Sequence, residues 1–172
     1  MLAYQQGDLE ALDRIYRLMQ KPLYSFIFRY TRDEQLSIDI VQDTFLKLQD
    51  HKQQFDPAIG KLKSFLFQIA YRLMVNKLNR RKKLSALLPF LVPRPKEEMA
   101  RSDQITVRDA VSQLRDTERA VILLFYYHDL SQEEMAQVLG IPKGTVKSRL
   151  HRATKQLKND LEGFYDDSRA TQ

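Results

Sequence analysis

The 172-residue chain has no cysteine and no tryptophan, and it has only three histidines and five glycines. Without cysteine it can have no disulfide scaffold, no thiolate metal site and no thiol nucleophile. The histidines His51, His128 and His151 stand far apart, and the glycines form no phosphate-binding loop. The sequence therefore offers no nucleophile–base pair, no metal-ligand cluster and no cofactor motif, and we expect a protein that is not an enzyme.

Long apolar runs are also missing. No stretch approaches the roughly 18 residues needed to span a bilayer, and the N-terminus lacks the basic-then-apolar layout of a signal peptide. We therefore expect a cytoplasmic protein that is not itself inserted in a membrane. Positive charge, in contrast, is abundant: 28 Lys+Arg against 22 Asp+Glu give a net charge of +6. This excess predicts an anionic partner, either nucleic acid or an anionic membrane surface.

Composition divides the chain into three parts. Residues 1–84 contain 15 basic and 9 acidic residues, a net charge of +6, whereas residues 85–103 and 104–172 are each neutral. The middle part holds Pro89, Pro93 and Pro95, which interrupt helices and favour extended backbone. We expect two small domains, 1–84 and 104–172, joined by a Pro-containing linker. The alternative is a long loop inside one domain, which is uncommon in compact folds.

Apolar residues recur at helical spacing in both expected domains, so an all-α fold is predicted. In the first domain we expect one helix that Pro22 ends, a second over 23–30, a third, and a fourth from 62 to about 83. The apolar stripe of the third helix is Ile38, Val41, Phe45 and Leu48. After the linker we expect helices over 105–114 and 117–127, then two short helices and a long last one.

Residues 131–152 predict a helix-turn-helix. Ser131 and Glu134 have the spacing of a capping box, in which each side chain bonds the other residue's backbone N–H. Gly140 can end that helix in the left-handed conformation, and Pro142 suits the start of the next. Two short helices with a glycine in the turn are typical of this DNA-binding motif.

The second helix of the motif is basic, with six positive charges and no acid between Lys143 and Lys158. Because the start of this helix enters the major groove in such motifs, the candidate DNA contacts are Lys143, Thr145, Lys147, Ser148, Arg149, His151 and Arg152. The charges alone would fit a solvated helix face equally well. The capping box and the turn in front of them favour DNA binding.

A second basic segment, residues 61–83, has eight positive charges and no acid. One helical face gathers Arg72, Asn76, Lys77 and Arg80, and a loop precedes it at 54–60. Phe67 and Tyr71 lie off the main apolar stripe of this helix, so they are either core residues or platforms on which unpaired bases stack.

The expected third helix carries a different surface, formed by Asp39, Gln42, Asp43 and Leu46. An acidic–amide patch beside an exposed leucine is a poor DNA surface. It is suited to protein docking, although ordinary solvation would explain every residue except Leu46.

Three segments together resemble the extracytoplasmic-function (ECF) group of bacterial RNA polymerase sigma factors. Residues 37–48, SIDIVQDTFLKL, and 65–73, FLFQIAYRL, are similar to two motifs of that group, and 130–153, LSQEEMAQVLGIPKGTVKSRLHRA, match its helix-turn-helix nearly throughout. The resemblance runs from about residue 7 to residue 162. It implies a region 2-like domain, a flexible linker that threads a polymerase channel, and a region 4-like helix-turn-helix domain.

The resemblance also implies a function and partners. The chain would bind core RNA polymerase and direct promoter-specific transcription initiation, with an anti-sigma factor as regulator and no cofactor. Docking on the coiled coil of the largest polymerase subunit would use Asp39, Gln42, Asp43, Phe45 and Leu46. The −10 element, with a flipped base, would be read by Phe55, Lys61, Arg72, Asn76, Lys77 and Arg80. The basic helix from Lys143 to Arg152 would bind the −35 duplex.

Three positions depart from the family pattern. Tyr71-Arg72 stands where Arg-Asn is usual, Phe65 where Trp is usual, and Asn76 where Asp is common. These changes bear on the −10 preference. Two other functions remain open from the sequence: a stand-alone helix-turn-helix regulator, which would leave the Asp39–Leu46 patch unexplained, and a mimic that sequesters an anti-sigma factor, which would not need the charges from Lys143 to Lys158.

Overall fold

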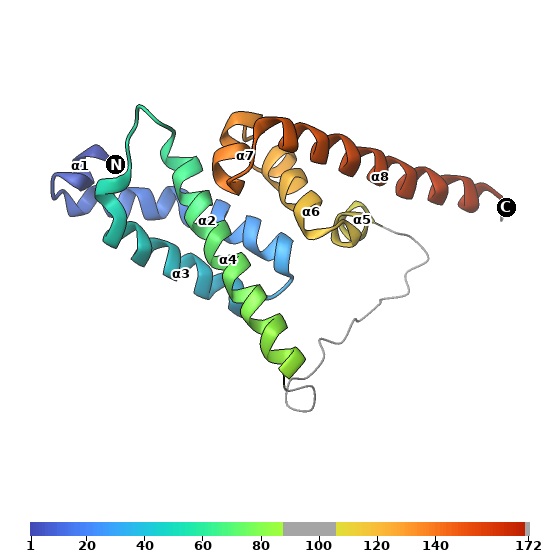
Figure 1. Cartoon of the computed structure of the whole chain (residues 1–172), viewed down its shortest axis with the longest axis horizontal. Coiled ribbons are helices and arrows are strands. Elements are labelled where there is room, and N and C mark those ends of the chain that lie inside the picture. The colour runs from blue at the N-terminus through green and yellow to red at the C-terminus, as the bar shows by residue number, and fades with distance from the viewer. Residues whose placement is uncertain (88–105, 171–172) are drawn as a thin grey trace.

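The computed structural model describes residues 1–87 and 106–170, and all regular secondary structure in these ranges is helical, as predicted. The N-terminal part holds α1 (Leu2–Gln5), α2 (Leu9–Thr31), α3 (Glu34–His51), the 3₁₀ turn η1 (Lys52–Gln54) and α4 (Leu62–Leu87). The C-terminal part holds α5 (Val107–Gln113), α6 (Asp116–Ile122), the π-helical turn η2 (Leu123–Tyr127), α7 (Gln132–Leu139) and α8 (Lys143–Ala170) (Figure 1). The expected linker 85–103 begins inside α4, and from residue 88 on it lies outside the described residues.

Helices α2, α3 and α4 pack against one another in a bundle. The first two begin at aspartates whose side chains accept a backbone N–H, Asp8 from Ala11 at 3.1 Å and Asp33 from Leu36 at 2.8 Å. The inward faces bury mainly aliphatic and aromatic side chains, including Leu23, Phe26, Ile27, Ile40, Leu48, Leu66, Phe67 and Met74. This burial holds α4, which carries the basic segment 61–83, against the bundle.

The prediction that Pro22 ends the first helix is wrong, because α2 runs unbroken from Leu9 to Thr31 with Pro22 inside it. A proline removes one backbone donor and crowds the carbonyl four residues before it. Here Ile15 on one side of the proline and Leu23 and Phe26 on the other are buried in the same core. Their combined burial outweighs one lost hydrogen bond.

The inward face of α3 also differs from the predicted stripe in one residue, since Ile38 is 37% exposed. The buried positions are Leu36, Ser37, Ile40, Val41, Thr44, Phe45 and Leu48. Residues 37, 41, 44 and 48 follow one another at steps of three and four, and this register turns Ile38 outward. The buried Thr44 hydroxyl is satisfied because it donates to the Ile40 carbonyl at 2.6 Å.

In the C-terminal part, α5, α6 and α7 each pack on α8. The second short helix and the long last helix expected from the sequence are in fact one helix, α8. Between Thr145 and Glu162 the chain has neither glycine nor proline, so nothing in that sequence ends the helix. The start of α8 carries the predicted DNA contacts, α6 packs on the helix, and Val146, Leu150 and Ala153 of α8 belong to the buried core.

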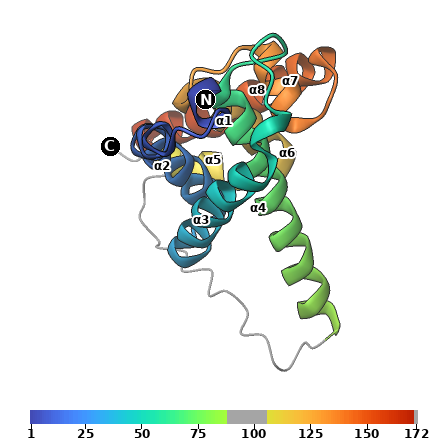
Figure 2. The ribbon, with the colours of Figure 1, turned by 90° about the vertical axis from the view of Figure 1, so that its left-hand side faces the viewer.

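The two parts lie against each other. Figures 1 and 2 show α7 beside the N-terminal half of α4, while α8 extends away from the N-terminal bundle, and α4 and α7 are in extensive contact. Also between the two parts, the ring of His128 packs on Phe67 and Phe26, with centroid distances of 4.9 and 5.8 Å. One continuous hydrophobic core therefore runs through both parts.

Candidate nucleic-acid interface

The helix-turn-helix has the predicted local geometry. The Ser131 hydroxyl accepts the Glu134 N–H at 3.2 Å, and the Glu134 carboxylate accepts the Ser131 N–H at 2.8 Å. Gly140 ends α7 with φ of 65°, in the left-handed region that costs glycine little. The Pro142 carbonyl accepts the N–H groups of Thr145 and Val146 and so starts α8.

The seven predicted contacts at the start of α8 share one helix, and five of them are exposed: Lys143, Lys147, Ser148, His151 and Arg152. Two of the cations already have acidic partners. Lys143 bonds Glu133 on α7, and Arg152 lies 3.7 Å from the carboxylate of Glu118, which is only 5% exposed. Lys147 and His151 face solvent, which leaves them open to a DNA duplex.

The predicted face of α4 is likewise mostly open. Arg72, Asn76 and Arg80 are exposed, but Lys77 is half-buried and pairs with Asp43 of α3 at 2.7 Å. Lys77 came from the predicted −10 face and Asp43 from the predicted docking patch. The structure joins the two surfaces at this pair, which sequence spacing alone did not indicate.

The loop before α4 is fixed by Phe55. This ring is 8% exposed and packs edge-on against Phe65 with centroids 5.6 Å apart. Its carbonyl, like that of Lys52, accepts a hydrogen bond of 2.8 Å from the Gln5 side chain. Phe55 thus shapes the loop rather than offering a free ring face to solvent. Phe67, left open by the sequence, is fully buried and is a core residue.

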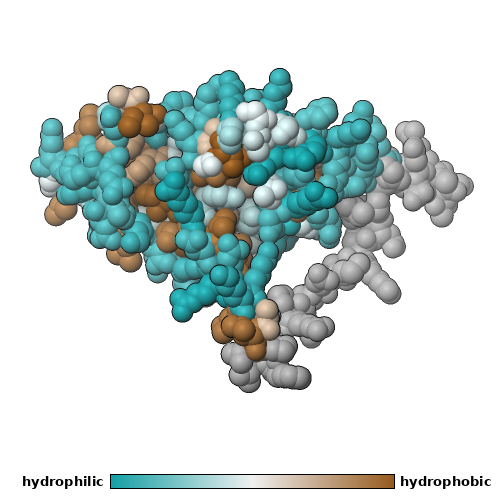
Figure 3. Space-filling view, in the orientation of Figure 1, coloured by the Kyte–Doolittle hydropathy of each residue, from teal (hydrophilic) through white to brown (hydrophobic). Residues whose placement is uncertain are grey.

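A pocket opens between this loop and α4. Its lining is largely amide and aromatic, formed by Gln54, Phe55, Asp56, Ile59, Gly60, Lys61, Ser64, Phe65, Gln68 and Gln137. The hydroxyl of Ser64 is buried and has no hydrogen-bond partner. Hydrophobic surface gathers at the loop tip, where Ile59 is 73% exposed, and at the C-terminal end of α4, on an otherwise largely hydrophilic face (Figure 3). Among the residues that line the pocket, Gln137 comes from α7, and no pattern in the sequence predicts its position here.

The predicted docking patch lies on α3 as expected, with Leu46 58% exposed. It borders a second pocket lined by Leu9, Leu12, Asp13, Tyr16, Gln42, Phe45, Leu46 and Gln49. The helical spacing of Leu9, Leu12, Ile15, Tyr16 and Met19 predicts one apolar stripe on the first helix, but Leu9 is 74% and Tyr16 40% exposed. The sequence could have indicated this apolar surface, because α2 carries more apolar residues near its start than one inward-facing stripe needs.

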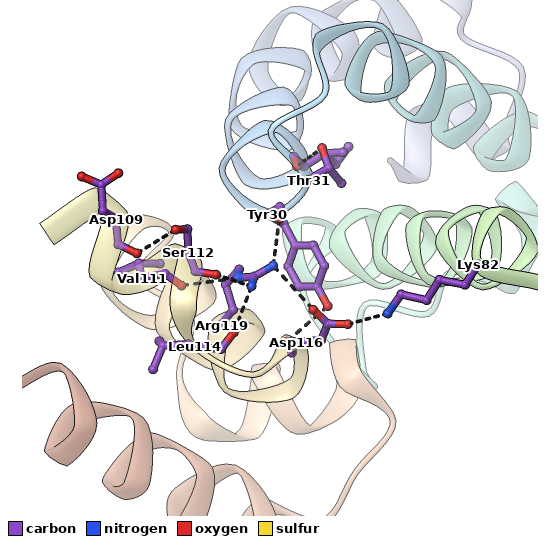
Figure 4. Close-up of polar contacts among 10 residues, drawn as sticks. Tyr30, Thr31, Lys82, Asp109, Val111, Ser112, Leu114, Asp116 and Arg119 are labelled. Atoms are coloured by element: carbon purple, nitrogen blue, oxygen red, sulfur yellow. Dashed lines mark hydrogen bonds and ion pairs between the residues drawn. The ribbon is translucent and has the colours of Figure 1, made fainter. Parts of the chain in front are cut away.

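Polar contacts bind the two parts of the chain beside these surfaces (Figure 4). Arg119 of α6 donates to the Tyr30 carbonyl at 3.2 Å, the Tyr30 hydroxyl donates to the Asp116 carbonyl at 3.2 Å, and Lys82 of α4 pairs with Asp116 at 3.1 Å. Burial raises the pKa of Tyr30, and the nearby Asp116 carboxylate raises it further. This phenol therefore stays a neutral donor at ordinary pH.

Two other titratable groups between the two parts of the chain, His128 and Glu134, have shifted pKa values. Burial lowers the pKa of His128 to about 4, helped by the positive charges of Lys63 and Arg29 and opposed by Asp129. Burial acts to raise the pKa of Glu134, but the hydrogen bonds from Ser131 and Lys61 outweigh it and lower that pKa. At neutral pH the interface thus contains a neutral imidazole and a charged carboxylate.

Among the described residues no cluster of His, Asp and Glu side chains is arranged to hold a metal ion. None of the helices in the described ranges is long and apolar enough to cross a membrane.

Known protein families match both parts of the chain. Residues 15–84 match the sigma-70 region 2 family and residues 104–157 match sigma-70 region 4. SigL of Mycobacterium tuberculosis, an ECF RNA polymerase sigma factor, is 31% identical over 146 residues, covering 81% of this chain and 82% of SigL. The chain belongs to the ECF RNA polymerase sigma factors. The resemblance seen in the sequence is confirmed.

Further relatives fit the same family. The ECF sigma factor SigM of Bacillus subtilis is 27% identical over 155 residues, covering 86% of this chain and 93% of SigM. Among solved structures, RpoE from Bartonella quintana, in complex with the anti-sigma factor NepR, aligns with a TM-score of 0.74 at 22% identity over 90% of this chain and 98% of that one. CnrH, in complex with the cytosolic domain of CnrY, gives a TM-score of 0.68 at 23% identity, over 92% of each chain. These two structures share the fold. As an ECF sigma factor, the chain associates with core RNA polymerase and directs promoter-specific transcription initiation.

Proposed function

We propose that this sigma factor divides promoter recognition and polymerase docking among three surfaces: the start of α8, the loop and face of α4, and the groove between α2 and α3. The observation that carries the proposal is the opposite character of these surfaces. Two are basic and polar, as phosphate neutralisation requires, whereas the third is acidic and apolar. A stand-alone DNA-binding regulator would have no use for the third surface.

The −35 duplex is read by the exposed start of α8. Lys147 and His151 face solvent, and the exposed Ser148 and the partly exposed Arg149 lie between them in the sequence. Lys143 and Arg152 exchange their present acidic partners for phosphates. In Figure 1 the start of α8 lies beside α7, and only the later part of the helix extends away from the N-terminal bundle.

The −10 element is bound by Arg72, Asn76 and Arg80 on α4, and a flipped base enters the pocket between the loop and α4. The pocket suits a base, since glutamine amides can pair with its hydrogen-bonding edge and Phe65 gives an apolar wall. Lys61, whose side chain is 78% exposed, lies at the pocket rim for the adjoining phosphate. The orphaned Ser64 hydroxyl can bond a base that fills the pocket.

Core polymerase docks on the groove between α2 and α3. Leu46 and Leu9 supply exposed apolar area, and Gln42 supplies an exposed amide. Asp39 on the same helix supplies negative charge, whereas Asp43 pairs with Lys77. Phe45 is only 7% exposed and packs on Tyr16 with ring centroids 4.8 Å apart, so it supports the groove wall from beneath. The coiled coil of the largest polymerase subunit is the proposed occupant.

We further propose that an anti-sigma factor holds the chain inactive, because the solved structure of RpoE is a co-crystal with the anti-sigma factor NepR. The role needs no catalytic group and no cofactor, and it is exercised in the cytoplasm, where polymerase and chromosome meet.

Selection of promoters from random DNA by the reconstituted holoenzyme tests the assignment of surfaces. Lys147→Ala and Arg149→Ala should relax the selected sequence upstream only, and Asn76→Ala and Arg80→Ala downstream only. Gln113→Ala, an exposed change on α5, is the matched control. If changes on α8 altered the downstream element instead, the proposed division of the promoter would be wrong.

A further inference from the structure

The short helix α1 is fastened to the segment that leads from α3 into the loop proposed to read the −10 element (Figure 1). The Gln5 side chain donates to the carbonyls of Lys52 and Phe55, in both cases at 2.8 Å. In the opposite direction, the Gln53 side chain donates to the Gln5 carbonyl at 3.2 Å. These hydrogen bonds join α1 to residues that lie 47 to 50 positions later in the chain.

The position of α1 is fixed on both sides of Gln5. On one side Tyr4 is only 4% exposed and belongs to the hydrophobic core, and the Lys52 ammonium lies 4.9 Å from the centroid of its ring. On the other side Gly7 has φ of 103°, a conformation that residues with a side chain rarely adopt. The Gly7 N–H donates to the Tyr4 carbonyl at 3.1 Å, so the chain turns sharply between α1 and α2. The buried ring and this turn together hold Gln5 against η1.

A glutamine at position 5 has the chemistry that this place requires. The last carbonyls of a helix have no partner within the helix, and here α3 ends at His51 and η1 at Gln54. A side-chain amide carries two N–H donors, which allows Gln5 to serve the carbonyls of Lys52 and Phe55 together. Alanine at this position would offer no donor. Glutamate, which has nearly the same size, would face the two carbonyls with further acceptors.

The segment that Gln5 holds forms one side of the proposed base pocket. Gln54, Phe55 and Asp56 follow one another in the sequence, and all three line that pocket. Discrimination between bases requires side chains held at fixed positions. We propose that Gln5 is a positioning residue for −10 recognition, which fixes the backbone that carries these three side chains. The proposal rests on the function proposed for the pocket, and it concerns a helix that precedes the region 2 match, which begins at residue 15.

Transcription by reconstituted holoenzyme tests the proposal on a set of promoters in which each base of a selected −10 and −35 element is changed singly. For Gln5→Ala and Gln5→Glu, the preference for the selected −10 bases should fall about threefold or more, while the −35 preference stays within about twofold of wild type. Gln6→Glu is the matched control, because Gln6 is the exposed neighbour and the change of charge is the same. Unchanged −10 preference in both Gln5 variants would overturn the proposal. An equal loss at both elements would overturn it too, since that loss indicates a general structural role.

Amide hydrogen exchange of the free chain, followed by mass spectrometry, tests the same contact without promoter DNA. Peptides that cover residues 52–61 should exchange about threefold or more faster in Gln5→Ala than in wild type, whereas peptides from α7 should not change. Alanine is a good helix former, so α1 itself is kept in this variant. Equal exchange of residues 52–61 in the two proteins would refute the positioning role.

Gln54→Ala separates this proposal from the proposed function, because it changes the lining of the pocket directly. Loss of −10 preference in Gln54→Ala, with none in the Gln5 variants, would refute the positioning role and leave the base pocket standing. If Gln54→Ala and the Gln5 variants all kept the wild-type −10 preference, the base pocket itself would be wrong and the positioning role with it.

Discussion

Protonation of His128 should weaken the fold as the pH falls below neutrality. The ring is 6% exposed, lies between Phe26 and Phe67, and has an Nε2 atom without a hydrogen-bond partner. Its folded pKa of about 4 lies below the ordinary value of 6.5. Between these two values the unfolded chain binds the proton more readily than the folded chain, so stability falls as the pH drops through that window.

The size of the effect follows from the two pKa values. Near pH 7.5 both states hold a neutral ring and the loss is negligible. Near pH 5 the unfolded state is almost fully protonated and the folded state is not, so about 2 kcal/mol of unfolding free energy is lost. Other groups titrate as well, notably the carboxylate of Glu134, whose lowered pKa places its loss of stability at more acidic pH.

Urea unfolding followed by far-ultraviolet circular dichroism gives the measurement, since the chain has no tryptophan to report by fluorescence. His128→Phe keeps a ring of similar size and removes the proton site, so its stability difference between about pH 7.5 and 5 should be smaller than that of wild type by about 2 kcal/mol. His151→Gln, an exposed change, is the control and should behave as wild type. Equal pH dependence in wild type and His128→Phe would refute the reasoning.

Three further predictions follow from named contacts. Arg149→Ala should weaken binding to a selected −35 duplex by about 1–3 kcal/mol at matched salt. Arg152→Ala should weaken that binding too, and it should lower the melting temperature because it leaves the buried Glu118 unpaired. Unchanged DNA binding in both variants would remove α8 from the −35 site. Leu9→Ala with Leu46→Ala should reduce affinity for core polymerase roughly tenfold or more, with Leu18→Ala, 74% exposed and outside the groove, as control; equal affinities would exclude the groove. Gly140→Ala should cost roughly 1–2 kcal/mol of stability, because its φ of 65° strains a side chain, and an unchanged melting temperature would contradict the turn geometry.

The local signals in the sequence predicted local structure well. Ser131, Glu134 and Gly140 specify a helix start and end through contacts within a few residues, and each has the predicted geometry. Pro22 and Ile38 were misjudged because the rules used there, proline as a helix stop and a single apolar stripe, yield to burial in a core formed by distant segments.

The contacts between residues far apart in the chain could not be predicted from the sequence. The pairing of Lys77 with Asp43, and of Gln137 with the loop, depends on which helix faces meet, and that is decided by the packing of the whole bundle. Asp43→Arg with Leu46→Ala, a natural choice from the sequence for testing docking, would also place like charges together at Lys77. The Leu9 and Leu46 pair is the cleaner choice.

The central claim, that this chain is a sigma factor, is tested most directly by mixing the purified protein with bacterial core RNA polymerase and separating the mixture by size exclusion at moderate salt. The account predicts a stoichiometric complex that initiates at promoters selected with it. Elution of the folded, inhibitor-free chain apart from core polymerase would contradict the account.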